Sequence, residues 1–195
     1  YAGFTGHLHD HTNVILMEAE GRSFLRNARE DFDLIIQNNT LTQTASTAGA
    51  YALAEDYVLT VESFVDYLRK LTPGGILYIS QPHELGIRLV TIAIEAYRKL
   101  GWKNLAESIC SMHSGDNYTR EFIMIKKGGY TPLEARRLRQ MASMFNLTLN
   151  YAPGSKQNTL HKQLIDARDD TKKLNALYDA SYSDIRPSTD NWPFF

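Results

Sequence analysis

Short apolar runs alternate with stretches of helical periodicity along most of the chain. Three of these runs have the length of buried strands: residues 14–18, 33–37 and 76–80. Between the first two runs, residues 22–30 space their apolar side chains as an amphipathic helix does. This order predicts a strand–helix–strand unit whose strands are parallel and whose crossover is right-handed.

A long helix is predicted over residues 55–71, where the apolar side chains form one stripe. The sequence Thr-Pro-Gly-Gly at residues 72–75 ends this helix, and a further helix is predicted over residues 85–100. Residues 38–54, which follow the second strand, are small and polar. This composition is typical of a loop, and in α/β sheets the loops after strand ends are where ligands bind.

Residues 107–113 and 120–127 flank a turn, and they predict an antiparallel hairpin at one edge of the sheet. Residues 131–144 begin with a capping box and a proline at the first helical position, which predicts another helix. Residues 147–151 predict a last short strand. The fold class is therefore α/β.

Residues 155–195 form a C-terminal extension, which is polar and mostly helical before it becomes a tail. The tail contains Trp192, Phe194 and Phe195. Large apolar side chains at a chain end are costly to leave in water, so we expect these three to be ordered and largely buried.

The chain has 195 residues and a net charge of −1, with 21 basic and 22 acidic side chains. The length predicts a single domain over residues 1–195, and the charge balance argues against a nucleic-acid partner. The single cysteine, Cys110, excludes a disulfide framework and fits a reducing, cytoplasmic location. Since no apolar run approaches the roughly 20 residues of a membrane span, we expect membrane attachment only through segments outside this chain.

Three histidines and an aspartate lie close together in residues 7–11, His-Leu-His-Asp-His. Imidazoles and carboxylates are zinc ligands, and metallohydrolases of the β-lactamase type use a similar run. In this chain the run has one residue fewer before the aspartate, and no suitable later ligands accompany it. We therefore expect no metal site and interpret the run as a polar surface segment.

Candidate ligand contacts follow two of the predicted strands. Glu20 and Gly21 follow the first strand, where a carboxylate can accept hydrogen bonds from an adenine amine or a ribose hydroxyl. Asn38 and Asn39 follow the second strand, and their amides would face the same crevice. Each pair also has a plainer interpretation, as a solvated strand end or as the cap of a turn.

Three motifs connect this order of segments to a known family: residues 4–8 (Phe-Thr-Gly-His-Leu), 55–62 (Glu-Asp-Tyr-Val-Leu-Thr-Val-Glu) and 188–195 (Ser-Thr-Asp-Asn-Trp-Pro-Phe-Phe). The chain resembles the second half of the spermidine synthase family, within the class I S-adenosylmethionine-dependent methyltransferase fold. It looks most like the spermidine synthase-like domains of bacterial multi-pass membrane proteins. The resemblance implies a transferase ancestry and a Rossmann-like sheet that is incomplete at its N-terminal strands. It also implies the cytoplasmic part of a membrane protein.

The resemblance assigns Glu20 and Gly21 to the adenine end of the cofactor site, with Asn38 and Asn39 across the crevice. In that family an Asp after the fourth strand accepts a proton and anchors the polyamine. Asn38 stands at this position, and an amide does neither. The family's glycine-rich loop and ribose-binding acid would lie ahead of Tyr1. We therefore expect no bound cofactor here, and S-adenosylmethionine or its decarboxylated form in the complete fold.

These departures predict a spermidine synthase-like domain without aminopropyltransferase activity. Two alternatives remain open. One is a non-catalytic binding or scaffolding module of a larger membrane-associated protein. The other is a methyltransferase whose glycine loop precedes this chain, which a strand and a Gly-x-Gly loop ahead of Tyr1 would identify.

The missing strands also predict an exposed sheet edge. In the complete fold two further strands lie between those that match residues 14–18 and 33–37. Without them, the strand at 33–37 keeps unpaired backbone groups. We expect residues 14–18 to pair directly with 33–37, because local closure costs less entropy than association. The alternative is a homodimer in which a second copy covers the edge.

Overall fold

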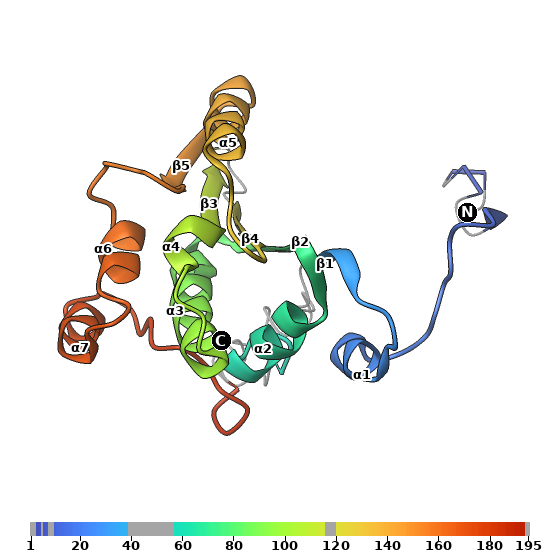
Figure 1. Cartoon of the computed structure of the whole chain (residues 1–195), viewed down its shortest axis with the longest axis horizontal. Coiled ribbons are helices and arrows are strands. Elements are labelled where there is room, and N and C mark those ends of the chain that lie inside the picture. The colour runs from blue at the N-terminus through green and yellow to red at the C-terminus, as the bar shows by residue number, and fades with distance from the viewer. Residues whose placement is uncertain (1–2, 5, 8–9, 39–56, 116–119, 194–195) are drawn as a thin grey trace.

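The computed structural model describes residues 3–4, 6–7, 10–38, 57–115 and 120–193. Within these residues the strands form one mixed sheet in the order β1-β2-β4-β3-β5 (Figure 1). The strands are β1 (Phe32–Asn38), β2 (Leu71–Pro82), β3 (Ile109–Ser114), β4 (Arg120–Lys126) and β5 (Leu147–Tyr151). β1 and β2 run parallel, and the other neighbouring pairs are antiparallel.

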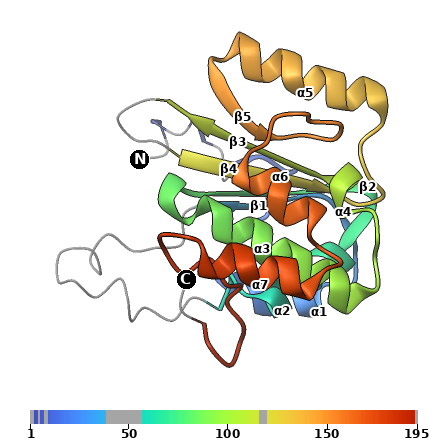
Figure 2. The ribbon, with the colours of Figure 1, turned by 90° about the vertical axis from the view of Figure 1, so that its left-hand side faces the viewer.

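Helices pack on both sides of this sheet (Figure 2). They are α1 (Gly21–Asn27), α2 (Val61–Arg69), α3 (His83–Leu100), α4 (Leu105–Ser108), α5 (Pro132–Met144), α6 (Leu160–Asp166) and α7 (Thr171–Asp179). The mixed sheet with flanking helices confirms the predicted α/β fold. Among the helices described, none combines the length and the apolar character needed to cross a bilayer.

The main core lies on one face of the sheet, which we call the inner face. Side chains alternate along a strand, so Leu77 and Ile79 of β2 point to this face together with Ile123 and Ile125 of β4. α2 and α3 bury their apolar stripes against these side chains, and Leu164 of α6 joins the same core. The inner face is thus covered by helices along most of its width (Figures 1 and 2).

The opposite, outer face is covered only in part. Cys110 and Met112 of β3 pack there against Leu138 of α5, in a second and smaller core. Over β1 the outer face is open, because Leu34 and Ile36 remain exposed. A strand that is apolar on both faces is typical of a sheet covered on both sides. The described residues supply that cover for β3 and β5 but not for β1.

The predicted hairpin is confirmed as β3 and β4, which pair antiparallel with Cys110 opposite Met124. β5 pairs with the other side of β3 and so occupies the edge itself. The predicted start of α5 is also confirmed, because Thr131 and Glu134 form a capping box there. The helix predicted over residues 55–71 is shorter in the structure: α2 begins at Val61, and Thr60 is its N-cap residue.

The strand predicted at residues 14–18 does not form. These residues have no regular secondary structure, lie outside the sheet, and expose Ile15, Leu16 and Met17 to water. The expected pairing of this segment with β1 is therefore wrong, since β1 has β2 as its neighbour in the described sheet. An apolar run becomes a strand only where a neighbouring strand satisfies its backbone groups, and no strand of the described sheet pairs with this segment.

The C-terminal tail leaves its tryptophan more exposed than predicted, although the Trp192 ring lies 5.9 Å from the guanidinium of Arg88. Trp192 is 43% exposed, so its expected burial is wrong, and Phe194 and Phe195 lie outside the described residues. Ser188, in contrast, is fully buried, and its carbonyl accepts a hydrogen bond from the N–H of Val61 at 2.9 Å. The tail is therefore fixed by backbone and hydroxyl hydrogen bonds at the start of α2.

Candidate functional site

Glu20 begins α1 as its N-cap residue. Its carboxylate accepts hydrogen bonds from the backbone N–H groups of Arg22, at 2.9 Å, and Ser23, at 2.7 Å. The first N–H groups of a helix have no partner within the helix, so this capping stabilises α1. The hydrogen bonds from Ser23 and Arg22 hold the pKa of Glu20 below its usual 4.5, although partial burial acts to raise it.

A hollow of about 430 Å³ lies beside α1, and Glu20 forms part of its wall together with Met17, Phe24 and Asn27. An apolar wall with a carboxylate at its rim is a suitable surface for a planar base such as adenine. A Cβ atom at Gly21 would meet nothing within 4 Å, so no packing within the described chain requires glycine there. Gly21 is not among the residues that line this hollow, so the contact of Glu20 and Gly21 with an adenine stays a prediction.

Asn38 lies in a different place. It ends β1 opposite Ser80 of β2, and its side chain is exposed. Asn38 is not among the residues that line the hollow beside α1, so the structure does not bring it together with Glu20 in that hollow. Asn39, the other amide predicted at this point, lies outside the described residues.

Arg22 joins α1 to α2 and to the C-terminal tail. Its Nε donates to Oδ2 of Asp66 at 2.8 Å, and Nη1 and Nη2 donate to the two carboxylate oxygens of Asp190 at 2.8 and 2.9 Å. Asp190 also accepts a hydrogen bond from the Thr60 hydroxyl at 2.7 Å. Burial acts to raise the pKa of Asp190, but the hydrogen bonds from Arg22 and Thr60 hold it below its usual value. The tail therefore fixes the helix that carries Glu20.

At the carboxyl end of β2, polar side chains replace the apolar ones of the inner face. Gln81 of β2, Glu121 of β4 and His113 of β3 lie side by side in register. His83 at the start of α3 and His161 of α6 approach the same carboxylate. We call these five residues the Glu121 cluster. A buried ionisable group at the carboxyl end of a parallel strand is a candidate functional site.

Glu121 is only 1% exposed and lies between two imidazoles. Its Oε1 is 2.5 Å from Nε2 of His161 and accepts a hydrogen bond from the Ser111 hydroxyl at 2.6 Å. Its Oε2 is 3.0 Å from Nδ1 of His83. Burial acts to raise the pKa of Glu121, but the hydrogen bonds with His161 and Ser111, together with the charge of the imidazoles, hold it below 4.5.

The Glu121 cluster is closed toward α3. A Cβ atom at Gly86 would stand 2.3 Å from both Cδ and Oε2 of Glu121, so the helix backbone lies directly over the carboxylate. The rings of His83 and His113 contact each other with centroids 4.3 Å apart. Through these contacts the carboxylate joins α3 and α6 to the sheet.

The sequence analysis missed this cluster, because His83, His113 and His161 are far apart in the chain and only the sheet register and α6 bring them together. One signal was present. In β4, the alternation that buries Ile123 and Ile125 also buries Glu121. A carboxylate on the buried side of a strand must be paired, so the pattern predicts partners without naming them.

The Glu121 cluster predicts sensitivity to acid. Because the folded-state pKa of Glu121 lies below its usual 4.5, its stabilising contribution is complete above that value and is lost as the pH falls through the lower folded value. We expect Glu121→Gln to make the free energy of unfolding, measured with urea, less dependent on pH below about 4.5. Glu84→Gln, at an exposed position in the first turn of α3, is the matched control. An equal change in both variants would contradict the prediction.

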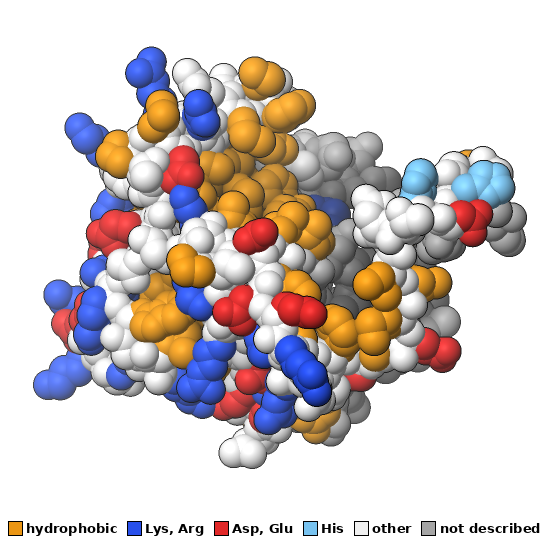
Figure 3. All heavy atoms as spheres, turned by 45° about the vertical axis from the view of Figure 1, so that its right-hand side comes forward, with side chains coloured by type: hydrophobic (Ala, Val, Ile, Leu, Met, Phe, Trp, Pro, Cys, Tyr) orange, Lys and Arg blue, Asp and Glu red, His pale blue; other side chains and the backbone are white. Residues whose placement is uncertain are grey.

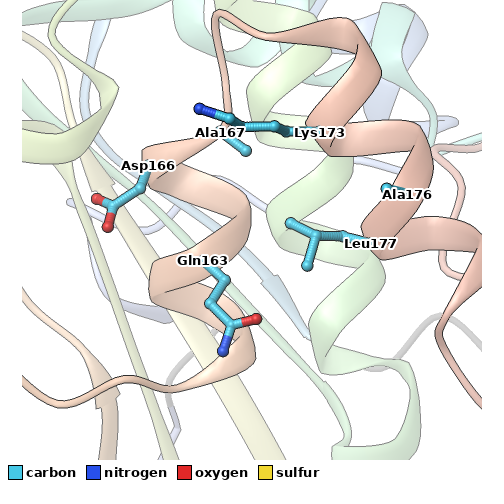
Figure 4. A pocket seen from close by; sticks show the side chains of 6 residues that line it. All are labelled: Gln163, Asp166, Ala167, Lys173, Ala176 and Leu177. Carbon is cyan, nitrogen blue, oxygen red and sulfur yellow. The ribbon is translucent and has the colours of Figure 1, made fainter.

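Two further hollows lie away from the residues predicted from the sequence. One, of about 450 Å³, lies between α6 and α7 (Figure 4) and is lined by Gln163, Asp166, Ala167, Lys173, Ala176 and Leu177. The polar ends of its lining residues point in different directions, so they do not converge on one ligand. The other, also of about 450 Å³, lies between the start of α3 and residues 182–185.

The described residues contain no group of three or more His, Cys, Asp or Glu side chains that could hold a metal ion. In the run at residues 7–11, Nδ1 of His7 lies 3.0 Å from Oδ2 of Asp10. His9 lies outside the described residues.

In the described residues, these observations define an α/β fold with a mixed five-stranded sheet. No protein-family model matches the chain, and a search of curated proteins finds no match. Among solved structures, the chain is similar to a spermidine synthase in complex with the transition-state analogue AdoDATO, with a TM-score of 0.41 and 14% identity. The match covers 90% of this chain and 54% of the other, so the chain spans about half the length of that spermidine synthase. The likeness is one of fold, at a distant level.

Proposed function

We propose that this chain is a spermidine synthase-like domain, S-adenosylmethionine-type in ancestry, that does not transfer aminopropyl groups. The ancestry rests on the sequence motifs, and the absence of transfer rests on Asn38. In aminopropyl transfer an amine nitrogen attacks the carbon beside a sulfonium, so the amine must first lose a proton. The side chain at the end of β1 is an amide, which cannot accept that proton.

Glu121 does not replace the missing base. A general base must come within about 3 Å of the proton that it removes. Glu121 is buried beneath Gly86, and its oxygens already lie against His161, Ser111 and His83. Its lowered pKa also makes it a weak base near neutral pH. The buried carboxylate at this end of the sheet is therefore unsuited to the reaction.

We expect no aminopropyl transfer to putrescine above the uncatalysed rate when the chain is supplied with decarboxylated S-adenosylmethionine. The reaction is measured by chromatography of the polyamine product. Asn38→Asp places a carboxylate at the end of β1, and Asn175→Asp, at an exposed position on α7, is the control for the added charge. Turnover by the unmodified chain that Asn38→Ala abolishes would overturn the proposal.

Calorimetric titration with S-adenosylmethionine, its decarboxylated form and methylthioadenosine tests the cofactor separately. We expect no saturable heat with any of the three. Saturable binding of S-adenosylmethionine that Glu20→Ala removes would instead favour a methyltransferase. Asn27→Ala, in the same hollow but without a carboxylate, would be the matched variant.

A second candidate function, that of a binding or scaffolding module, is favoured by the open outer face of the sheet. Leu34 and Ile36 are exposed there, and the rings of Tyr78 and Phe122 stack beside them with centroids 5.9 Å apart. Apolar side chains also gather on the face shown in Figure 3. A contiguous apolar surface is typical of a site that another molecule covers.

A further inference from the structure

Helix α5 presents an apolar stripe to solvent, on the side away from its core contacts. The residues that it buries are Ala135, Leu138 and Ala142. On the other side, four residues follow one another at spacings of four, four and three positions: Leu133, Arg137, Met141 and Met144. Residues at such spacings share one face of a helix. The three apolar members of this outer stripe are exposed, Met144 most of all at 74%.

The same side of α5 carries positive charge that is not neutralised within the described chain. Arg137 lies inside the outer stripe and Arg136 lies beside it, and both are exposed. Neither forms an ion pair with any residue that the structure describes. The acidic residue of α5, Glu134, is already bound to Nζ of Lys126 at 2.6 Å. The outer stripe therefore combines apolar side chains with two unpaired guanidiniums, which calls for an anionic partner.

The position of α5 suits a partner with a broad surface. The helix lies at one end of the molecule, at the top of Figures 1 and 2. From Leu133 to Met144 the outer stripe extends roughly 16 Å, at 1.5 Å per residue. A second copy of α5 is an unsuitable partner, because the same cations would face one another.

The place of Arg137 within the stripe favours a lipid surface over a protein. In a protein interface, a guanidinium surrounded by apolar side chains loses its water and needs a specifically placed acid. At a lipid surface, the long side chain of Arg137 can extend to the headgroup phosphates while its methylene groups stay among apolar atoms. A helix that combines exposed apolar and basic side chains is typical of this kind of contact.

We propose that α5 binds an anionic lipid surface. Leu133, Met141 and Met144 would enter the boundary between headgroups and acyl chains, and Arg136 and Arg137 would meet the headgroup phosphates. This contact differs from the attachment expected from the sequence, which lies in segments outside the chain, and it needs no spanning helix. The inference does not depend on the proposed function.

Flotation of the unmodified chain with lipid vesicles tests the contact. Vesicles of phosphatidylcholine alone are compared, at low ionic strength, with vesicles of phosphatidylcholine and phosphatidylglycerol in equal amounts. We expect the chain to float with the anionic vesicles and not with the neutral ones. Added salt should release it, because salt screens the attraction between the guanidiniums and the headgroups. No flotation with anionic vesicles, or equal flotation with both kinds, would overturn the proposal.

Two double variants test whether α5 makes the contact. Arg136→Gln combined with Arg137→Gln should lower the partition coefficient about 30-fold, since each basic side chain near an anionic surface contributes about fivefold. Lys172→Gln combined with Lys173→Gln removes the same charge from exposed positions on α7 and should leave the partition coefficient nearly unchanged. All four positions are exposed, so both variants should fold. Equal losses in the two variants would show a general effect of charge and would contradict the proposal.

A fluorescent label reports whether the outer stripe enters the lipid. Met144→Cys is labelled with an environment-sensitive dye, and Tyr182→Cys, at a fully exposed position outside α5, is the control. The native Cys110 stays unlabelled, because it is fully buried and its burial raises the pKa of the thiol to about 12. Anionic vesicles should shift the emission of the Met144→Cys label to the blue and leave the control unchanged. The same spectral response in both chains would contradict the proposal.

An acidic polypeptide is the alternative partner for the same two guanidiniums. Titration with polyglutamate, followed by the same label on Met144→Cys, separates it from a lipid surface. We expect at most weak binding that salt abolishes, because polyglutamate offers no apolar phase for the outer stripe. Binding of polyglutamate by a chain that does not float with anionic vesicles would identify a polypeptide partner and overturn the lipid contact.

Discussion

Replacing Arg22 by alanine is expected to lower the free energy of unfolding by about 3 kcal/mol, or the melting temperature by roughly 6–12 °C. The guanidinium is buried and makes three charge-assisted hydrogen bonds with Asp66 and Asp190. Its removal takes the buried cation away from two carboxylates that lie close together, and leaves only the exposed Arg26 near Asp66. The loss falls at the lower end of the range for a broken buried pair, because the Asp190 side chain keeps some contact with water.

Arg26 provides the matched control on the same helix. Its Nε lies 3.8 Å from Asp66, but its side chain is 63% exposed, against 10% for Arg22. Exposed ion pairs contribute about 1 kcal/mol or less, so Arg26→Ala should change the melting temperature little. The melting temperature of Arg22→Lys should lie between those of Arg22→Ala and the unmodified protein, since an ammonium cannot make the two parallel hydrogen bonds that the guanidinium makes with Asp190. Equal melting of the Arg22→Ala and Arg26→Ala variants would show that the network contributes little.

Replacing Gly86 by alanine is expected to lower the free energy of unfolding by about 3 kcal/mol, although the change adds only one methyl group. The new Cβ would stand 2.3 Å from Cδ and Oε2 of Glu121 and 2.6 Å from its Cβ. Glu121 cannot move aside, because His161 and Ser111 hold it. Alanine has a higher helix propensity than glycine by about 1 kcal/mol, but the cost of the clash with Glu121 is larger than this gain.

Gly21→Ala is the control, because Gly21 also lies in the first turn of a helix but its Cβ would meet nothing within 4 Å. We expect Gly21→Ala to melt at or slightly above the temperature of the unmodified protein. Glu121→Gly removes the three atoms nearest to the new Cβ. In this background, Gly86→Ala should lower the free energy of unfolding much less than it does in the unmodified protein. Independent, additive losses in that double variant would contradict a direct clash between the two residues.

Much of the secondary structure follows from local patterns. The stripe in α2 and the capping box of α5 are fixed by residues within a few positions of one another, and the structure confirms both. The strands of the hairpin follow in the same way from alternation along β3 and β4. Local patterns predict these elements because the interactions that form them are local.

The sequence predicted individual residues of the candidate site but not how they are arranged. The sequence indicated that Glu20 and Asn38 follow strand-like runs, but it did not show that Glu20 caps α1 or that Asn38 lies outside the hollow beside Glu20. The capping role had a signal, an acidic residue directly before a helix. No signal in the sequence indicated that Glu20 and Asn38 lie apart, because their separation depends on how α1 packs against α2.

The sequence by itself determined the α/β class, the places where most helices and strands form, and the amide at the end of β1. Tertiary structure decided what each segment pairs with. Residues 14–18 have the composition of a strand but pair with no strand of the described sheet, and Asp190 of the tail pairs with Arg22 while Trp192 stays 43% exposed. The three histidines of the Glu121 cluster meet only when β3, β4, α3 and α6 assemble. The physical reason is that hydrogen bonds and buried charges are satisfied by partners distant in the chain, and the composition of a segment does not specify those partners.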